Sequence, residues 1–158
     1  MRALVQRVTR GSVAIAGEIR AAIGKGYVIL LGVRKGDTTA DALFLADKCS
    51  VLRVMEDGGG KMNLGLREAG GSALVVSQFT LYADAQKGNR PGFIDAAAPE
   101  EALPLYEAFV RRMRENLDPD AVRTGEFRAM MEVTIVNDGP VTILIESPTH
   151  NQPRSASS

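Results

Sequence analysis

The longest apolar run of the chain, residues 27–33, most restricts the folds that this sequence can adopt. It reads Tyr-Val-Ile-Leu-Leu-Gly-Val and carries apolar side chains at successive positions rather than at alternate ones. A strand of this kind is covered on both faces, so it belongs in the interior of a sheet. The run is far too short to span a bilayer, for which a helix needs about 20 apolar residues. The sequence therefore predicts a globular fold around a buried central strand.

Several shorter β-rich segments accompany this run. The first two, residues 3–8 and 12–15, are followed by Ala16-Gly17, which offers a tight turn into residues 18–23 and predicts a hairpin. Further strands are predicted at residues 53–56, 73–81, 131–136 and 141–146. This number of short strands indicates a mixed or antiparallel sheet.

Two segments repeat apolar residues at helical spacing. The first, residues 39–50, follows Thr38, which forms the pattern of a capping box with Asp41. The second has an acidic start at residues 99–101, but Pro104 interrupts its pattern. The regular part of that helix is therefore predicted to begin only at Pro104.

Length and composition agree with one globular domain. The chain has 158 residues, of which 45% are hydrophobic, and is long enough to bury a sizeable core. Many strands combined with two main helices indicate the α+β class. We expect the single domain to cover residues 1–147, followed by a polar, proline-containing tail at residues 148–158 that is disordered.

Charge and cysteine content limit the partners and the compartment. Lys plus Arg and Asp plus Glu both number 19, so a basic footprint for a nucleic acid would have to be local. Cys49 is the only cysteine, which excludes an intrachain disulfide and agrees with a reducing compartment. Residues 1–10 lack the continuous apolar stretch of a signal peptide. The sequence therefore predicts a cytoplasmic protein that is not inserted in a membrane.

The chain lacks the residues that many hydrolases use. His150 is its only histidine and lies in the tail, which argues against a Ser-His or Cys-His nucleophilic pair. A zinc site built from histidine and cysteine would have too few ligands. The segment 58–61, Gly-Gly-Gly-Lys, lacks the spacing of a phosphate-binding loop and is interpreted as a hairpin turn. We therefore expect no metal and no cofactor.

Two short segments place polar groups or a special dipeptide where an apolar strand stops. The first, Ser77-Gln78-Phe79-Thr80-Leu81, is either an ordinary strand that leaves the core or a cleft where backbone N–H groups bind an oxyanion. Thr80 would act as a nucleophile only beside a base, and the sequence names none. The second segment is residues 137–142, where Gly139-Pro140 is either a turn between two strands or a cis peptide.

Two local basic clusters are candidates for phosphate contacts. Lys87 and Arg90 lie in a polar segment, whereas Arg111, Arg112 and Arg114 lie in the second predicted helix. Each cluster is either an ordinary solvated surface or a contact to nucleic-acid phosphates.

Taken together, the two motifs resemble the signature motifs of D-aminoacyl-tRNA deacylases, hydrolases that proofread the chirality of charged tRNA. The motif residues are Ser77-Gln78-Phe79-Thr80-Leu81 and Asn137-Asp138-Gly139-Pro140-Val141-Thr142. Segments 5–8, 24–26, 61–64 and 87–91 are also similar to that family in order and spacing. The resemblance covers residues 1–147.

The resemblance implies a homodimer of α+β subunits with active sites at the subunit interface. The substrate would be a D-amino acid esterified to the 3′-terminal adenosine of tRNA, and the reaction would be hydrolysis of that ester. Glycyl-tRNA mischarged on tRNA(Ala) would be a second substrate, because glycine has no side chain to exclude. In this family, the 2′-hydroxyl of the terminal ribose has a central role in catalysis.

The resemblance also implies roles for individual residues. Gly139 and Pro140 would form a cis dipeptide that reaches into the site of the partner subunit and blocks the side chain of an L-amino acid. Arg7 would hold this dipeptide in orientation. The catalytic pocket would contain Ser77, Gln78, Phe79 and Thr80, substrate binding and chiral selection would involve Arg7, Asn137, Gly139 and Pro140, and Lys87 and Arg90 would contact tRNA.

One segment departs from the family pattern. Residues 127–131 read Phe-Arg-Ala-Met-Met where family members commonly have Phe-Gly-Ala-Asp-Met, so Arg128 stands in place of a glycine and Met130 in place of an aspartate. Two alternatives to the editing hydrolase remain open from the sequence. One is a catalytically silent dimer that binds nucleic acid, and the other is a general small-ester hydrolase with Thr80 as nucleophile.

Overall fold

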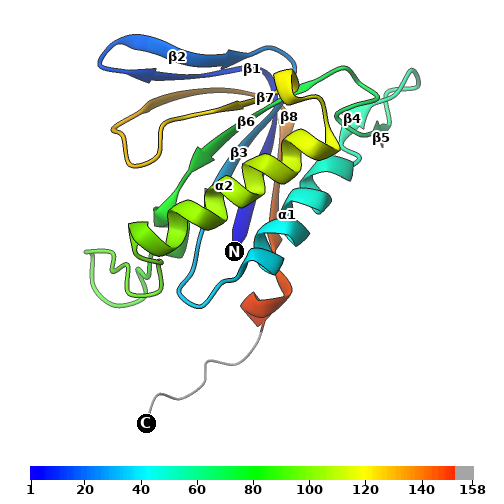
Figure 1. Cartoon of the computed structure of the whole chain (residues 1–158). Coiled ribbons are helices and arrows are strands. Elements are labelled where there is room, and N and C mark those ends of the chain that lie inside the picture. Colours follow the sequence, from blue (N-terminus) through cyan, green and yellow to red (C-terminus); the bar gives the residue numbers. More distant parts are fainter. Residues whose placement is uncertain (152–158) are drawn as a thin grey trace.

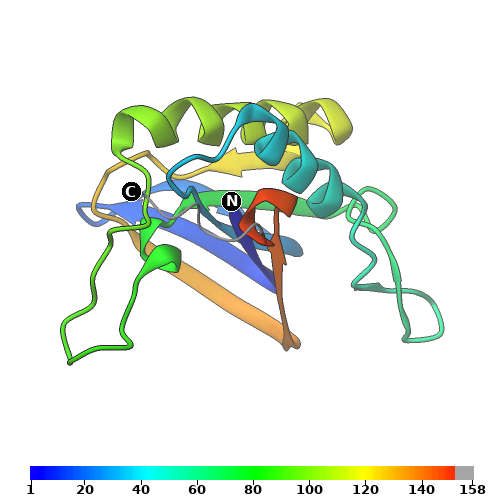
Figure 2. The same ribbon diagram turned by 90° about the horizontal axis from the view of Figure 1, so that it is seen from below.

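The computed structural model describes residues 1–151, which form a curved β-sheet with two helices on one of its faces (Figures 1 and 2). The strands are β1 (Arg2–Ile15), β2 (Glu18–Ile23), β3 (Gly26–Gly32), β4 (Met55–Glu56), β5 (Met62–Leu64), β6 (Ser72–Ser77), β7 (Val122–Thr124) and β8 (Glu132–Glu146). The helices are α1 (Thr39–Val51) and α2 (Pro99–Asn116), and short 3-10 helices are η1 (Phe79–Tyr82), η2 (Pro119–Ala121) and η3 (Pro148–Asn151). The predicted α+β class and mixed sheet are confirmed.

Strand β1 organises the main sheet because both of its edges are paired. On one edge it pairs antiparallel with β3 through residues 2–8 and with β2 through residues 11–15. On its other edge it pairs antiparallel with β8, from Arg2 opposite Glu146 to Ala14 opposite Glu132. The sheet continues from β3 into β6 and β7 by parallel pairing. The two strands predicted for residues 3–8 and 12–15 are thus one long strand.

Strand β3, the predicted central strand, is buried on both faces. Tyr27, Ile29 and Leu31 belong to the larger core between the sheet and the helices, whereas Val28 belongs to a second apolar cluster. Successive side chains of a strand point to opposite faces, which explains this division. Complete burial of a side chain such as Ile29, with an exposed fraction of 0%, stabilises the fold by about 1.5–3 kcal/mol.

Both predicted hairpin turns are present. Ala16 and Gly17 have positive φ angles of 50° and 81°, as a tight two-residue connection between β1 and β2 requires. Between β4 and β5, the carboxylate of Asp57 accepts a hydrogen bond from the Gly59 N–H at 2.8 Å. The glycine-rich segment 58–60 is therefore a turn.

Helices α1 and α2 lie side by side on the same face of the sheet (Figures 1 and 2). The capping box of α1 is confirmed, because the Thr38 N–H donates to Oδ2 of Asp41 at 2.8 Å. Cys49 is fully buried on α1, and this burial raises the pKa of its thiol to about 12. A thiol of this kind stays protonated and inert.

The start of α2 differs from the prediction. The helix begins at Pro99, and Pro104 lies inside it. Pro104 lacks the N–H that would bond to the carbonyl of Glu100, but both residues are exposed, so water can satisfy that carbonyl. The interruption costs one backbone hydrogen bond and does not delay the helix.

The last part of the chain also differs from the prediction. The sequence predicts separate strands at residues 131–136 and 141–146, but residues 132–136 and 141–146 belong to the one strand β8, which pairs with β1. Asn137 lies opposite Val8 and Thr142 lies opposite Gln6, so residues 138–141 bulge out opposite a single β1 residue. The dipeptide Gly139-Pro140 lies in this bulge and not in a turn between strands.

The described chain continues past the predicted domain end at residue 147. Residues Pro148–Asn151 form η3, and the Thr149 hydroxyl donates a hydrogen bond to Oδ1 of Asp41 on α1. The tail predicted to be disordered comprises residues 148–158, of which residues 152–158 lie outside the described residues. Within the described range, no helix has the length and apolar character needed to cross a membrane.

Candidate functional site

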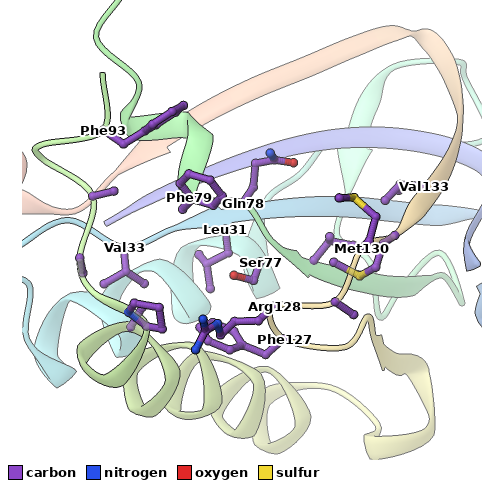
Figure 3. A pocket seen from close by; sticks show the side chains of 17 residues that line it. Leu31, Val33, Ser77, Gln78, Phe79, Phe93, Phe127, Arg128, Met130 and Val133 are labelled. Carbon is purple, nitrogen blue, oxygen red and sulfur yellow. The ribbon is translucent and has the colours of Figure 1, made fainter. Parts of the chain in front are cut away.

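A pocket of about 690 Å³ lies at the C-terminal ends of the parallel strands β3 and β6 (Figure 3). Its walls also include the loop that leads into α2, the first turn of α2, and residues 127–131 between β7 and β8. Ligands in sheets of this kind commonly bind beyond the carboxyl ends of parallel strands. We therefore take this pocket as the candidate active site.

The backbone turns sharply where β6 ends in the pocket. Ser77 pairs with Leu31, and the Gln78 N–H donates to the Leu31 carbonyl oxygen at 2.8 Å. The strand predicted to continue to residue 81 stops here, because β3 ends beside it and β7 pairs only with residues 73–75. The 3-10 helix η1 follows, and the first N–H groups of a helical turn have no partner within it. The Phe79 and Thr80 N–H groups thus stand at the end of β6 as backbone donors.

Three of the four predicted catalytic residues line the pocket, namely Ser77, Gln78 and Phe79. Thr80 is not among the lining residues, and its hydroxyl accepts a hydrogen bond from the side-chain amide of Gln78. Within the described part of the chain, no carboxylate or imidazole is hydrogen-bonded to the Thr80 hydroxyl. The geometry therefore gives Thr80 no base that would make it a nucleophile.

An exposed aromatic pair stands at one side of the pocket (Figure 3). The rings of Phe79 and Phe93 meet edge to face with centroids 5.1 Å apart. Their exposed fractions are 57% and 37%, so both rings offer apolar surface to a ligand. Aromatic faces of this kind stack on nucleobases.

The opposite side of the pocket is formed by a tight turn after β7. The Ala129 N–H donates to the Glu126 carbonyl oxygen at 3.2 Å, and Arg128 has a φ angle of 65° at the third position of this turn. Positive φ at that position is the mark of a type II turn, which favours glycine. A residue with a Cβ in this conformation costs roughly 1–2 kcal/mol. Arg128 is thus placed at the pocket against the preference of the backbone.

Tyr106 on α2 packs against Phe127 of this turn. Its ring lies 5.7 Å from that of Phe127, centroid to centroid, and its hydroxyl donates to the Val75 carbonyl oxygen at 3.0 Å. Burial raises the pKa of the Tyr106 hydroxyl to about 12, so the hydroxyl keeps its proton at neutral pH. This contact ties the pocket wall to the core of the domain.

The bulge in β8 is held by Arg7, whose exposed fraction is only 5%. Nε of Arg7 donates to the Asp138 carbonyl oxygen at 3.1 Å, and Nη1 donates to the Val54 carbonyl oxygen at 2.8 Å. Nη2 would lie 3.3 Å from a Cβ placed on Gly139, which has a φ angle of 133°. The Gly139-Pro140 peptide is cis, as the second interpretation of this dipeptide expected.

Asn137 secures the other side of the bulge. Its Oδ1 accepts from the Val141 N–H at 3.0 Å, and its Nδ2 donates to the Thr142 hydroxyl at 3.0 Å. Gly139 and Pro140 themselves are exposed. The predicted group Arg7, Asn137, Gly139 and Pro140 is therefore brought together by the fold.

This group does not line the pocket of the same chain. Arg7 pairs with Tyr27 near the start of β3, whereas the pocket lies beyond the end of β3. The predicted tRNA contacts, Lys87 and Arg90, lie on an exposed loop near the pocket but are not among its lining residues. Within one chain, the predicted residues thus form separate regions.

Most pocket residues, among them Phe93, Phe127 and Arg128, were not assigned to the site from the sequence. Phe93 and Phe127 lie in segments without a periodic pattern, which gave no signal of their position. Arg128 did carry a signal, because it replaces a residue that is commonly glycine. It is the only charged residue among the described residues that line the pocket.

The described residues contain no group of three or more histidine, cysteine, aspartate or glutamate side chains placed to hold a metal ion. The chemical groups at the pocket are backbone N–H donors, a hydroxyl, an amide, aromatic rings and one guanidinium. Such a set can bind an ester and stabilise an oxyanion, but it contains no general base of its own.

Sequence comparison places this geometry beside known proteins. The family model described as D-Tyr-tRNA(Tyr) deacylase matches residues 4–146. The D-aminoacyl-tRNA deacylase of Anaeromyxobacter dehalogenans (strain 2CP-C) is 56% identical over 147 residues, covering 93% of this chain and 97% of the relative. That of Chloroflexus aurantiacus (strain ATCC 29364 / DSM 637 / Y-400-fl) is 53% identical over 158 residues, covering 100% and 98%.

Solved structures show the same fold. The c-Myc DNA Unwinding Element Binding Protein superposes with a TM-score of 0.89 at 43% identity, over 94% of this chain and 99% of that one. A probable eukaryotic D-amino acid tRNA deacylase superposes with a TM-score of 0.77 over 92% and 98% of the two chains. Its identity is only 16%, so this second likeness concerns the fold alone.

Proposed function

Because the chain belongs to the D-Tyr-tRNA(Tyr) deacylase family, we propose that it hydrolyses D-aminoacyl-tRNA at the pocket beyond β6 and rejects L-aminoacyl-tRNA with the Gly139-Pro140 bulge of a partner subunit. The chain is a D-aminoacyl-tRNA deacylase, a hydrolase that acts on ester bonds. We propose separate roles for the residues of the pocket, which bind the ester, and for those of the bulge, which exclude one enantiomer. A tRNA substrate and a single buried cysteine favour the cytoplasm as its compartment.

The division of the motifs between two regions supports a homodimeric site. The pocket carries Ser77, Gln78 and Phe79, while Gly139 and Pro140 are exposed elsewhere on the same chain. A second copy can bring its own bulge to the pocket, which one chain does not do by itself. Leu144 on β8 has an exposed fraction of 50%, so β8 also offers apolar surface for such a contact.

Chiral selection by exclusion needs a rigid element. Arg7 is buried and bonds to the backbone on both sides of its guanidinium, at Asp138 and Val54. A bulge held in this way can block one enantiomer without recognising any particular side chain. Glycine has no side chain to block, so glycyl-tRNA mischarged on tRNA(Ala) is a second substrate under this proposal.

Hydrolysis requires little from the protein side chains. An aminoacyl ester is already activated, and water adds to its carbonyl carbon to form a tetrahedral oxyanion. The N–H groups of Phe79 and Thr80 are the proposed donors to this oxyanion, each worth about 2.7–4 kcal/mol in such a role. The bond between the carbonyl carbon and the ribose 3′-oxygen then breaks, and this oxygen takes up the proton that the attacking water loses. The neighbouring 2′-hydroxyl passes this proton from the water to the 3′-oxygen in place of the missing base.

The direct test compares D-tyrosyl-tRNA with L-tyrosyl-tRNA and follows loss of the ester. We expect fast loss of the D-ester and slow loss of the L-ester. Comparable rates for both enantiomers would contradict chiral selection. Binding of tRNA without any turnover would instead support the silent nucleic-acid binder considered from the sequence.

The dimeric site has its own test. Sedimentation at micromolar concentration should give a dimer, and a Gly139→Trp variant should disturb the pocket of the partner subunit. Mixing this variant with an excess of a Ser77→Trp variant should restore part of the activity, because one pocket of the mixed dimer then has both intact regions. A monomer that retains full activity would exclude the shared site.

A further inference from the structure

We propose that Arg128 binds a phosphate group of the tRNA acceptor end, the phosphodiester on the 5′ side of the terminal adenosine. Arg128 is then a substrate-binding residue of this chain. The inference rests on the proposed function, in which this pocket receives the aminoacylated 3′ end of tRNA.

Charge at the pocket is the first observation. Arg128 is the only charged residue among the described lining residues, and the others are apolar or neutral, such as Ser77 and Gln78. Its side chain is exposed, and no described residue forms an ion pair or hydrogen bond with it. A guanidinium without a carboxylate partner beside a mostly apolar pocket attracts an anionic group of a ligand.

The position of Arg128 is the second observation. Figure 3 shows Arg128 and Phe127 on one side of the pocket and Gln78 and Phe79 on the other, with Ser77 between them. An ester held at Ser77 and Phe79 therefore shares one pocket with the guanidinium. Under the proposed function, the rest of the terminal nucleotide with its phosphate would extend from this ester within the pocket, where Arg128 is the charged residue among the described lining residues.

The backbone of Arg128 is the third observation. The turn from Glu126 to Ala129 is closed by a hydrogen bond of 3.2 Å, and Phe127 is supported by Tyr106. These contacts fix the point from which the Arg128 side chain starts. The φ angle of 65° suits glycine better than arginine, so the turn itself does not explain the residue found there. A role of the side chain does explain it.

A phosphate suits this guanidinium better than an amino-acid side chain does. Every aminoacyl-tRNA carries the phosphodiester, whereas only acidic amino acids carry a carboxylate. Arginine can bind two phosphate oxygens at once through its planar fork. Lys87 and Arg90 are exposed but are not among the residues that line the pocket.

The test uses three D-tyrosyl esters with the full-length protein: 3′-O-D-tyrosyl-adenosine, its 5′-monophosphate, and D-tyrosyl-tRNA. Arg128→Gly removes the guanidinium and suits the turn, and Arg128→Lys keeps the charge without the fork. Arg123→Ala is the matched control, because Arg123 is an exposed arginine on β7 that does not line the pocket. Thermal unfolding of each variant shows that the fold is kept.

We expect the wild type to prefer the 5′-monophosphate ester over the adenosine ester by about tenfold in kcat/KM, mainly through KM. Arg128→Gly should lose this preference, while Arg128→Lys keeps part of it. For tRNA, the slope of log KM against log salt should fall by about 0.7 in Arg128→Gly, as expected for one phosphate contact on a single strand. Arg123→Ala should resemble the wild type.

Two results would overturn the inference. The first is an Arg128→Gly variant that keeps the wild-type preference for the 5′-phosphate. The second is a loss confined to D-aspartyl-tRNA, which would assign Arg128 to an acidic side chain of the substrate. Binding of AMP and adenosine measured by calorimetry gives the same comparison without turnover. A wild type that binds AMP more tightly than adenosine but cleaves no D-ester would contradict the proposed function and still support the phosphate site.

Discussion

The two interruptions of the sheet, at the end of β6 and in the middle of β8, are built in opposite ways. After Ser77 the strand stops, and the exposed rings of Phe79 and Phe93 contact each other at the pocket. In β8 the strand continues around a bulge, and Arg7 and Asn137 bond to the backbone of that bulge. The first region offers exposed apolar surface, whereas side-chain hydrogen bonds hold the backbone of the second.

This difference fits the proposed function, in which the pocket binds the substrate and the bulge excludes one enantiomer. A binding surface for many amino acids needs groups that act on the shared part of the substrate, namely the ester and the nucleotide. An element that excludes one enantiomer must keep its position when the wrong enantiomer contacts it. The hydrogen bonds from the buried Arg7 guanidinium hold the bulge in position, whereas the exposed aromatic rings at the pocket have no comparable support among the described residues.

The largest expected effect comes from removing the support of the bulge. Arg7→Ala leaves the Val54 carbonyl and the bulge backbone without their donor, so we expect a loss of about 2–3 kcal/mol in the free energy of unfolding. The ratio of D-tyrosyl-tRNA to L-tyrosyl-tRNA hydrolysis should fall with it. Urea unfolding and the two rates measure both effects. Arg7→Lys keeps a cation at this position but lacks the planar guanidinium that bonds to both carbonyl oxygens. Unchanged selectivity in this variant would refute the proposed role of Arg7.

The second largest effect is expected from Asp41, a carboxylate outside both regions, and concerns the stability of the fold. Burial by itself would raise the pKa of Asp41, but hydrogen bonds from Thr149 and Thr38 outweigh it and lower the pKa to about 2 from the ordinary 3.8. The folded-state pKa is depressed, so this group stabilises the fold above its ordinary pKa. That stabilisation, up to about 2 kcal/mol, is lost as the pH falls through the folded-state value.

The free energy of unfolding of Asp41→Asn should change less between about pH 6 and about pH 3 than that of the wild type. Selectivity between D- and L-esters at neutral pH should stay the same, because Asp41 touches neither the pocket nor the bulge. A changed D/L ratio would mean that selectivity follows global stability and not the local support of the bulge.

The aromatic pair should have a smaller effect and act on binding. Phe79→Ala and Phe93→Ala each remove an exposed ring, and their interaction measured in a double-mutant cycle should be about 0.5–1.5 kcal/mol. We expect KM for D-tyrosyl-tRNA to rise while the D/L ratio and the urea midpoint change little. A large loss of selectivity in these variants would erase the distinction between the two regions.

Thr80→Val should have the smallest effect. The Thr80 hydroxyl accepts a bond from Gln78 and has no base beside it, while its backbone N–H survives the substitution. We therefore expect kcat to fall by less than about threefold. Single-turnover hydrolysis of D-tyrosyl-tRNA measures this directly, and complete loss of activity in a folded variant would restore Thr80 as a nucleophile.

Local patterns in the sequence were enough to predict much of the fold. The buried strand at residues 27–33, the hairpin at Ala16-Gly17 and the capping box at Thr38 are all present. Each depends on side-chain periodicity or on turn chemistry within a few residues. The errors in the sheet fell where a distant segment decides the backbone, as at residue 78, where β6 ends beside the last residues of β3, and in β8, where pairing with β1 joins two predicted strands into one.

The sequence by itself determined the α+β class, the two motifs and the absence of a second histidine or cysteine, because residue types and their spacing are local properties. Only the tertiary structure decided that Arg7 bonds to Asp138, which lies 131 positions away, and that Arg128 faces the same pocket as Ser77. Both placements result from strand pairing and packing between segments far apart in the chain. No local pattern encodes such contacts, since their free energy exists only once the distant partners meet.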